Sequence, residues 1–83
     1  MGRRRKLLDR ILSGRSDTNI PFEQLRTLLR HLGFEERIRG SHHVFSREDV
    51  PALLDLQTTK EATAKPYQVK QVRELLRRYK IPE

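Results

Sequence analysis

The stretch RIRGSHHVF, Arg37 to Phe45, decides the fold that we expect, because it is typical of two short strands joined by a tight turn. Gly40-Ser41 is one of the dipeptides that close a two-residue hairpin, and Gly40 can adopt the positive φ that such turns need. In such a hairpin the residues that flank the turn pair across it, so Arg39 and His42 are expected to be neighbours.

Alternation along the strands predicts which side chains share a face of this hairpin. Successive side chains of a strand point to opposite faces, so one face is expected to carry Arg37, Arg39, His42 and Val44, and the other Ile38, Ser41, His43 and Phe45. Ile38 and Phe45 are apolar and are expected in the core. His42 is then expected to face outward, on a basic and open sheet face.

The rest of the chain predicts helices around this hairpin. The expected elements are a helix from Arg3 to Leu12, a helix from Pro21 capped by Gly33, strands Phe34–Arg39 and His42–Arg47, a loop Ser46–Pro51, a strand Ala52–Thr58 and a helix from Pro66. Apolar residues recur at helical spacing in each helix. This order predicts an α+β domain, a three-stranded antiparallel sheet with helices on one face.

The amino-terminal helix carries an apolar stripe that has to be covered. Leu7, Leu8, Ile11 and Leu12 fall at helical spacing, and Ser13-Gly14 ends the helix. The stripe is expected to pack on the protein's own core, with a partner protein as the alternative cover.

Composition narrows the classes of partner. The 83 residues suit one small domain, and 18 Lys and Arg against 11 Asp and Glu give a net charge of +7. Such a charge favours nucleic acid, an anionic membrane surface or an acidic protein as partner. There is no cysteine, so disulfides and thiolate metal sites are excluded. No apolar run is long enough to cross a membrane and no signal-type segment follows the basic start, so we expect a cytosolic protein.

Two segments carry a resemblance to a known family. LLRHLGFEERIRGSHHVF, Leu28 to Phe45, and AKPYQVKQVRELLRRY, Ala64 to Tyr79, resemble the HicA family of bacterial and archaeal toxins. These toxins are small mRNA interferases with a fold like the double-stranded-RNA-binding domain. The resemblance covers roughly residues 20 to 80, whereas residues 1–19 form a helical extension and connector that minimal members of the family lack.

The resemblance implies a function and a site. In the family the histidine directly after Gly-Ser is catalytic, and here that histidine is His42. The resemblance therefore implies that residues 20–83 are an endoribonuclease domain, the toxin of a type II toxin–antitoxin system. Its expected partners are mRNA and a neutralising HicB-like antitoxin, and no cofactor is expected.

The chemistry can also be argued from the residues. RNA cleavage without a metal needs a base for the ribose 2′-hydroxyl, and an imidazole with an ordinary pKa near 6.5 is largely neutral in the cell. Arg37 and Arg39 could hold the phosphate. The acid for the leaving oxygen stays open between His43, a lysine and water. Glu35-Glu36 has no second acidic cluster, so a metal-dependent nuclease site is not expected.

Further basic residues lie at the start of the last helix. Lys65 and Lys70 flank Pro66 there, and a helix amino-terminus with nearby lysines is a natural phosphate site. We expect both to bind RNA, with Gly40 and Ser41 as turn residues that position His42. A solvated turn histidine is the plainer interpretation of His42. The alternative functions are a non-catalytic RNA-binding module and a DNA-binding or protein-interaction domain.

Overall fold

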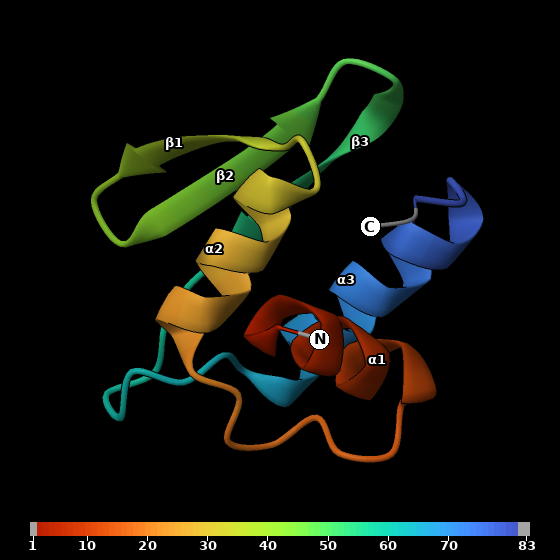
Figure 1. The fold of residues 1–83 in the computed structure, drawn as a ribbon. Coiled ribbons are helices and arrows are strands. Elements are labelled where there is room, and N and C mark those ends of the chain that lie inside the picture. The colour runs from red at the N-terminus through yellow and green to blue at the C-terminus, as the bar shows by residue number, and fades with distance from the viewer. Residues whose placement is uncertain (1, 82–83) are drawn as a thin grey trace.

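Three helices lie on one side of a three-stranded antiparallel sheet, and the other face of the sheet is open (Figure 1). The computed structural model describes residues 2–81. Its elements are α1 (Arg3–Ser13), α2 (Phe22–His31), β1 (Glu35–Arg39), β2 (His42–Arg47), β3 (Val50–Leu56) and α3 (Pro66–Arg78). The predicted α+β class, the number of strands and the placement of the helices are confirmed. Residue 1 of the expected extension 1–19 and residues 82 and 83 of the expected domain 20–83 lie outside the described residues.

The end of α2 sets the direction in which β1 leaves it. Gly33 has φ 95°, and its N–H donates to the Arg30 carbonyl at 3.0 Å while the Phe34 N–H donates to the Leu29 carbonyl, also at 3.0 Å. This pair of bonds is the Schellman motif, which needs a left-handed residue directly after the helix. The predicted Gly33 cap is therefore confirmed.

The hairpin has the predicted turn and register. Gly40 has φ 58°, and Arg39 faces His42 while Arg37 faces Val44 across β1 and β2. Strand β2 spans the predicted range, and β1 begins one residue later than predicted. The two-residue turn thus fixes which side chains share each face of the sheet.

The predicted loop from Ser46 to Pro51 is wrong. Strand β2 continues to Arg47 and β3 already begins at Val50, so the link is a two-residue turn. Val50 is buried, and the side chain of Arg47 reaches across the turn to the Asp49 carboxylate at 2.9 Å. Pro51 is compatible with β3 because β3 is an edge strand, whose outer N–H groups have no ladder partner.

The core lies between the inner face of the sheet and the helices. Its sheet residues are Phe45, Val50, Leu54 and Leu56, all buried. Ile38 was expected there too, and that prediction is wrong, since 54% of Ile38 is exposed. It lies on the same face as Phe45, but the β1–β2 turn projects past α2, so no helix covers this end of the hairpin (Figure 1).

Helix α1 belongs to the same core. Leu7, Leu8 and Ile11 are buried, Leu12 is partly buried against them, and α1 contacts both α2 and α3. The guanidinium of Arg73 on α3 donates to the Ile11 carbonyl at 3.2 Å. The apolar stripe of the extension is thus covered by the protein's own core. Within residues 2–81, no helix has the length and apolarity that crossing a bilayer requires.

Candidate active site

His42 faces outward from β2 and is held by a carboxylate of the neighbouring strand. Its side chain is 52% exposed, and its Nδ1 lies 2.9 and 3.2 Å from the two carboxylate oxygens of Asp55. Asp55 lies opposite Val44 in the register of β2 and β3, so His42 and Asp55 are diagonal neighbours on one face. The outward orientation predicted for His42 is confirmed.

The other ring nitrogen of His42 meets the side-chain amide of Gln57, which follows β3 directly. Gln57 Nε2 lies 3.1 Å from His42 Nε2 and donates to Ser41 Oγ at 3.2 Å. The ammonium of Lys65 donates to Gln57 Oε1 at 3.3 Å. A continuous chain of side-chain hydrogen bonds therefore runs from Asp55 through His42 and Gln57 to Lys65. We call these four residues the His42 network.

The partners in the His42 network fix where the histidine carries its proton. An ammonium can only donate, so the amide oxygen of Gln57 faces Lys65 and its NH₂ group faces His42. The NH₂ group is a donor, so His42 Nε2 accepts and the ring proton lies on Nδ1, where it donates to Asp55. In this tautomer the electron pair of Nε2 accepts from the Gln57 amide, and Nε2 can act as a general base once a substrate displaces that amide.

Gln57 is itself held by a buried side chain of α3. The Gln57 backbone N–H donates to Gln68 Oε1 at 3.2 Å, and Gln68 is only 4% exposed. Lys65 directly precedes Pro66, the first residue of α3. The bridge between Thr58 and Ala64 closes the loop that joins β3 to α3. The His42 network is thus built from β2, β3 and the start of α3.

The structure brings together most of the predicted site residues. Arg37 and Arg39 are exposed on β1 and share the outer face with His42, as their register shows. Lys65 joins the His42 network, whereas no hydrogen bond in residues 2–81 links Lys70 to it, and Lys70 is exposed on α3.

Two turn positions behave differently from each other. Gly40 provides the left-handed turn residue, as predicted. Ser41 was expected on the inner face, but its hydroxyl accepts the hydrogen bond from Gln57, the partner of His42. Ser41 lies in the turn and not in a strand, so the alternation of faces does not extend to it.

Asp55 and Gln57 were not predicted as site residues. Alternation along the third strand places them on one face, and this signal was available in the sequence. Their distance from His42 depends on the β2–β3 register, which the mistaken loop from Ser46 to Pro51 concealed.

His43 points to the inner face and serves the fold. Its Nδ1 lies 2.8 Å from Glu36 Oε2, and its ring meets Phe22 edge-on, with centroids 4.9 Å apart. Arg26 donates to the same carboxylate at 2.6 and 3.1 Å, and a further pair of bonds joins Arg26 to Glu23. His43 is therefore held on the inner face by Glu36 and Phe22 and cannot act at the open face.

Glu36 and Arg26 form a charge pair beneath the sheet. Burial raises the pKa of the Glu36 carboxyl, but the hydrogen bonds from Arg26 and His43 outweigh burial and hold that pKa below its ordinary value of 4.5. The hydrogen bonds to Glu36 and Glu23 in turn raise the pKa of Arg26. Glu36 is charged at neutral pH and stabilises the join between α2 and the hairpin.

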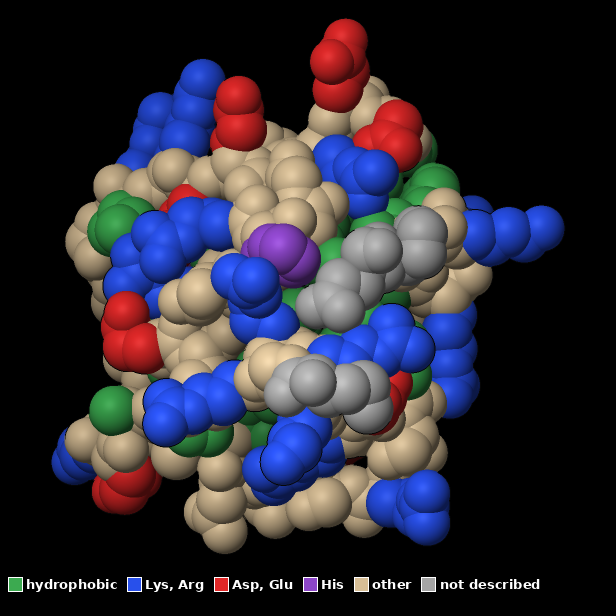
Figure 2. Space-filling model, in the orientation of Figure 1, with side chains coloured by type: hydrophobic (Ala, Val, Ile, Leu, Met, Phe, Trp, Pro, Cys, Tyr) green, Lys and Arg blue, Asp and Glu red, His purple; other side chains and the backbone are tan. Residues whose placement is uncertain are grey.

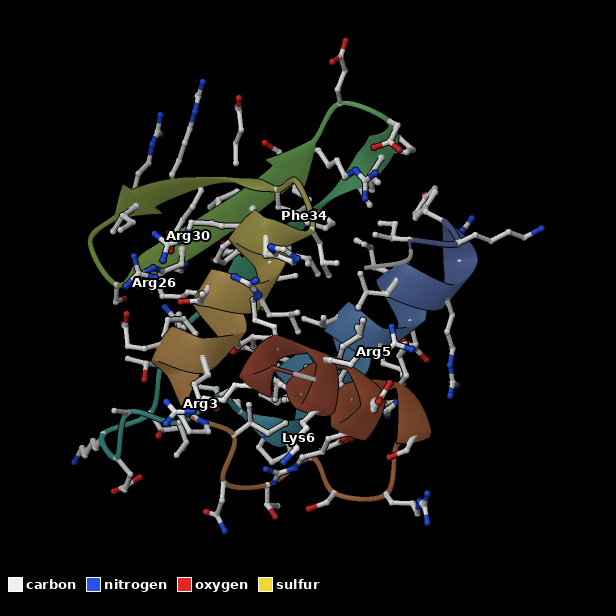
Figure 3. All side chains as sticks on the ribbon, in the orientation of Figure 1. Arg3, Arg5, Lys6, Arg26, Arg30 and Phe34 are labelled. Atoms are coloured by element: carbon white, nitrogen blue, oxygen red, sulfur yellow. The ribbon has the colours of Figure 1, made fainter. Side chains whose placement is uncertain are left out.

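Positive charge is not confined to the outer face of the sheet. Lys and Arg side chains are also spread over the side of the molecule that the helices present (Figure 2). Figure 3 labels several of them, with Arg3, Arg5 and Lys6 on α1 and Arg26 and Arg30 on α2. Because Arg26 is paired with two carboxylates, α1 is the part of the helical layer that provides a second surface able to attract an anion.

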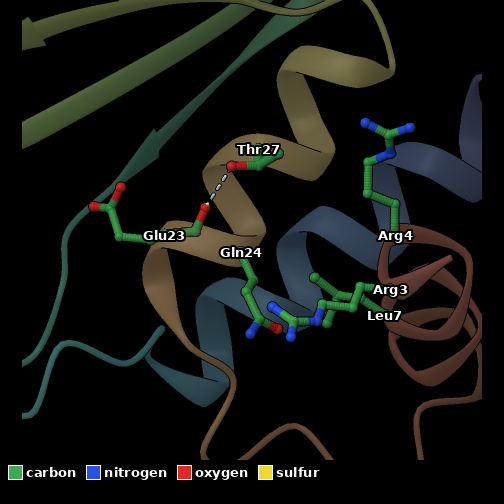
Figure 4. Close-up of a pocket in the computed structure, with 6 residues that line it drawn as sticks. All are labelled: Arg3, Arg4, Leu7, Glu23, Gln24 and Thr27. Carbon is green, nitrogen blue, oxygen red and sulfur yellow. Dashed lines mark hydrogen bonds between the residues drawn. The ribbon is translucent and has the colours of Figure 1, made fainter.

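A shallow pocket lies in this helical layer, between α1 and α2 (Figure 4). Its lining residues are Arg3, Arg4, Leu7, Glu23, Gln24 and Thr27. The Thr27 hydroxyl is occupied by the Glu23 carbonyl at 3.0 Å, and the pocket has no histidine. It offers cations and an apolar floor for binding but no general base of the kind His42 supplies. Residues 2–81 also contain no group of three or more histidine and carboxylate side chains able to hold a metal ion.

Comparisons of this chain with protein-family models, with curated proteins and with solved structures found no match.

Proposed function

We propose that the protein is a metal-independent endoribonuclease with His42 as its general base, acting as the toxin of a type II toxin–antitoxin system. The observation that carries the proposal is the His42 network itself, an outward histidine whose Nδ1 faces a carboxylate at 2.9 Å and whose Nε2 accepts from an amide. Arg37 and Arg39 lie on the same exposed face. A base and two phosphate-binding cations are thus within one small area.

The reaction that suits these groups is attack by the ribose 2′-hydroxyl on the adjacent phosphorus. His42 Nε2 takes the hydroxyl proton, and the imidazolium that forms is stabilised by Asp55 through the hydrogen bond at Nδ1. Arg37 and Arg39 bind the phosphate oxygens and stabilise the charge that gathers on them. The products are a 2′,3′-cyclic phosphate and a free 5′-hydroxyl, and every proton in this step can be carried by side chains or water.

The order of elements supports the family that the sequence resembles. From α2 onward the chain runs helix, three antiparallel strands, helix, the order expected of a domain like the double-stranded-RNA-binding domain. The Gly-Ser-His turn that carries the resemblance is the turn that presents His42. Within this proposal α1 is an addition to a HicA-like domain, and the domain works in the cytosol on mRNA.

The proposed partner is a HicB-like antitoxin that covers the outer face of the sheet. A protein bound there would exclude RNA from His42 and, if acidic, would be attracted by Arg37 and Arg39. RNA and antitoxin would then compete for one surface. Charge reversal at either arginine is expected to weaken the binding of both, and loss of RNA binding alone would place the antitoxin elsewhere.

The test uses the purified chain, an mRNA and excess EDTA. We expect cleavage into fragments with 2′,3′-cyclic phosphate and 5′-hydroxyl ends, and no cleavage by a folded His42→Ala protein. Cleavage that stops when EDTA is added, or full cleavage by His42→Ala, would contradict the proposal.

A non-catalytic RNA-binding module is the second candidate function. The cations of α1, in the helical layer, favour it because binding alone needs charge and no base (Figure 3). In the same experiment this candidate predicts RNA that is bound by both proteins and cut by neither.

A further inference from the structure

The Gln57 amide lies between two groups that could act on a phosphodiester. On one side His42 Nε2 accepts from its NH₂ group at 3.1 Å, and on the other the Lys65 ammonium donates to its oxygen at 3.3 Å. A planar amide of this kind is close in size to a phosphate group. In the free protein Gln57 thus occupies the position between His42 and Lys65 that a phosphate group of RNA would take.

The two sides of this gap have opposite proton roles. The hydrogen-bond pattern leaves His42 Nε2 as a proton acceptor, whereas the Lys65 ammonium can only donate. In cleavage by a 2′-hydroxyl, the attacking oxygen must lose a proton on one side of the phosphorus. The leaving 5′-oxygen needs a proton on the opposite side. Acceptor and donor are therefore distributed as an in-line displacement requires.

The other candidate for the acid lies on the wrong face. His43 is turned inward against Phe22 and Glu36. Of the two adjacent histidines, only His42 therefore lies on the open face of the sheet. Lys70 is exposed and has no hydrogen bond to the His42 network in the described part of the chain. Lys65 is the lysine that the structure joins to His42.

Lys65 is also held in place. It directly precedes α3 and is half-buried, and Gln68 of the same helix holds the backbone N–H of Gln57. A half-buried side chain loses less freedom than a fully exposed one when substrate binds, which favours a role in the reaction over that of a mobile surface charge.

We propose that Lys65 is the general acid of the reaction. The inference rests on the proposed ribonuclease function. When RNA displaces the Gln57 amide, His42 Nε2 takes the proton of the 2′-hydroxyl and the 2′-oxygen bonds to phosphorus. The bond from phosphorus to the 5′-oxygen breaks, and the Lys65 ammonium gives that oxygen its proton. His42 ends as the imidazolium and Lys65 as the amine, and exchange with water restores both.

The test compares two substrates of one sequence, made after the cleavage position in a natural RNA has been mapped. In the first the scissile 5′-oxygen is normal, and in the second it is replaced by sulfur, which leaves as a thiolate and needs no proton. Lys65→Met is expected to slow cleavage of the normal substrate by about 100-fold. On the sulfur substrate Lys65→Met and the unchanged protein are expected to differ by no more than about threefold.

Two control variants separate acid catalysis from charge. Lys80→Met removes the same charge from an exposed position beyond the other end of α3 and is expected to leave cleavage of both substrates within about threefold of the unchanged protein. Lys65→Arg keeps the charge, and therefore RNA binding, but its guanidinium is a far weaker acid, so it is expected to stay slow on the normal substrate alone. Circular dichroism verifies that each variant is folded, and Lys65→Arg carries the test if Lys65→Met is not.

Three results would overturn this assignment. They are normal cleavage of the oxygen substrate by both Lys65 variants, an equal loss on the two substrates, or an equal loss in Lys80→Met. Failure of the proposed function is distinguishable, because it appears as full activity of His42→Ala or as an absence of cleavage by the unchanged protein.

Discussion

The two histidines of the β1–β2 hairpin are adjacent in the chain and each lies against a carboxylate, but they lie on opposite faces of the sheet and have different roles. His42 and its partner Asp55 are both more than half exposed, and Nε2 of His42 meets the side-chain amide of Gln57 on the outer face. His43 and Glu36 are 14% and 6% exposed, and Arg26 and Phe22 enclose them. The contrast shows that a histidine–carboxylate pair becomes a candidate site only where a substrate can reach the second ring nitrogen, here by displacing the Gln57 amide.

Replacing each histidine in turn is expected to have the largest effects, on cleavage for His42 and on stability for His43. His42→Ala should lower RNA cleavage by more than about 1,000-fold and change the free energy of unfolding by less than about 0.5 kcal/mol, since an exposed side chain packs little. His43→Ala should lose about 2 kcal/mol of stability with its hydrogen bond and ring contact. At a temperature where His43→Ala is folded, its cleavage rate should be nearly normal. Denaturant titrations measure the stability of each variant, and initial rates measure its cleavage. A large loss of stability in His42→Ala, or a large loss of cleavage in His43→Ala, would contradict these separate roles.

Asp55→Asn tests whether the outer carboxylate sets the tautomer of His42. An asparagine amide can donate to Nδ1, which would move the ring proton to Nε2 and block the base, so cleavage should fall about 100-fold. Asp49→Asn removes the same charge from the β2–β3 turn, remote from His42, and should be nearly silent. Nitrogen-15 NMR of the His42 ring reads the tautomer directly. A ring that keeps its proton on Nδ1 in Asp55→Asn, with normal cleavage, would show that Asp55 plays no part.

Glu36→Gln is the matching change on the inner face, and its effect should be on stability alone. It leaves Arg26 and His43 without their carboxylate and should lower the free energy of unfolding by about 3 kcal/mol. The folded-state pKa of Glu36 is lowered, so its stabilisation is complete above the ordinary value of 4.5 and is lost as the pH falls below it. Denaturation between pH 7 and pH 3 should therefore show a shallower acid loss in Glu36→Gln than in the unchanged protein. An equal acid loss in both proteins would mean that other carboxyl groups are responsible.

The smallest effects concern which cations touch RNA. In an inactive His42→Ala background, Arg39→Ala should weaken RNA binding a few-fold and reduce the slope of log affinity against log salt by about 0.7, the value for one phosphate contact of a single strand. Arg4→Ala removes the same charge from α1 in the helical layer and should leave the slope unchanged. A larger change of affinity and slope in Arg4→Ala than in Arg39→Ala would mean that RNA binds the helical layer, and it would favour the non-catalytic RNA-binding module.

The elements of local structure could be predicted from the sequence, and the long-range register could not. The Gly40-Ser41 turn, the Gly33 cap and the apolar stripe of α1 depend on neighbouring residues or helical spacing, and they were predicted correctly. Ile38 was assigned to the correct face, yet it is exposed because no helix reaches the tip of the hairpin. Which part of a sheet the helices cover depends on packing between elements remote in the chain.

The candidate site divides in the same way. His42, Arg37 and Arg39 lie within one hairpin, so alternation alone placed them together. Asp55, Gln57 and Gln68 reach His42 through the β2–β3 register and the docking of α3. The Ser46–Pro51 segment, which contains a proline and three charged residues, was expected to be a loop. Because β3 is an edge strand, it can contain that proline. The pairing of β3 with β2 then sets the register that places Asp55 near His42.

Cleavage in excess EDTA tests most directly whether His42 activates the 2′-hydroxyl. The measurement compares an RNA oligonucleotide with the same oligonucleotide carrying a single 2′-deoxynucleotide at the mapped cleavage position. If His42 acts by activating the 2′-hydroxyl, the RNA is cut to a 2′,3′-cyclic phosphate, the substituted strand stays intact at that position, and His42→Ala cuts neither. Cleavage of the substituted strand at the same position, or products without a cyclic phosphate, would contradict the account.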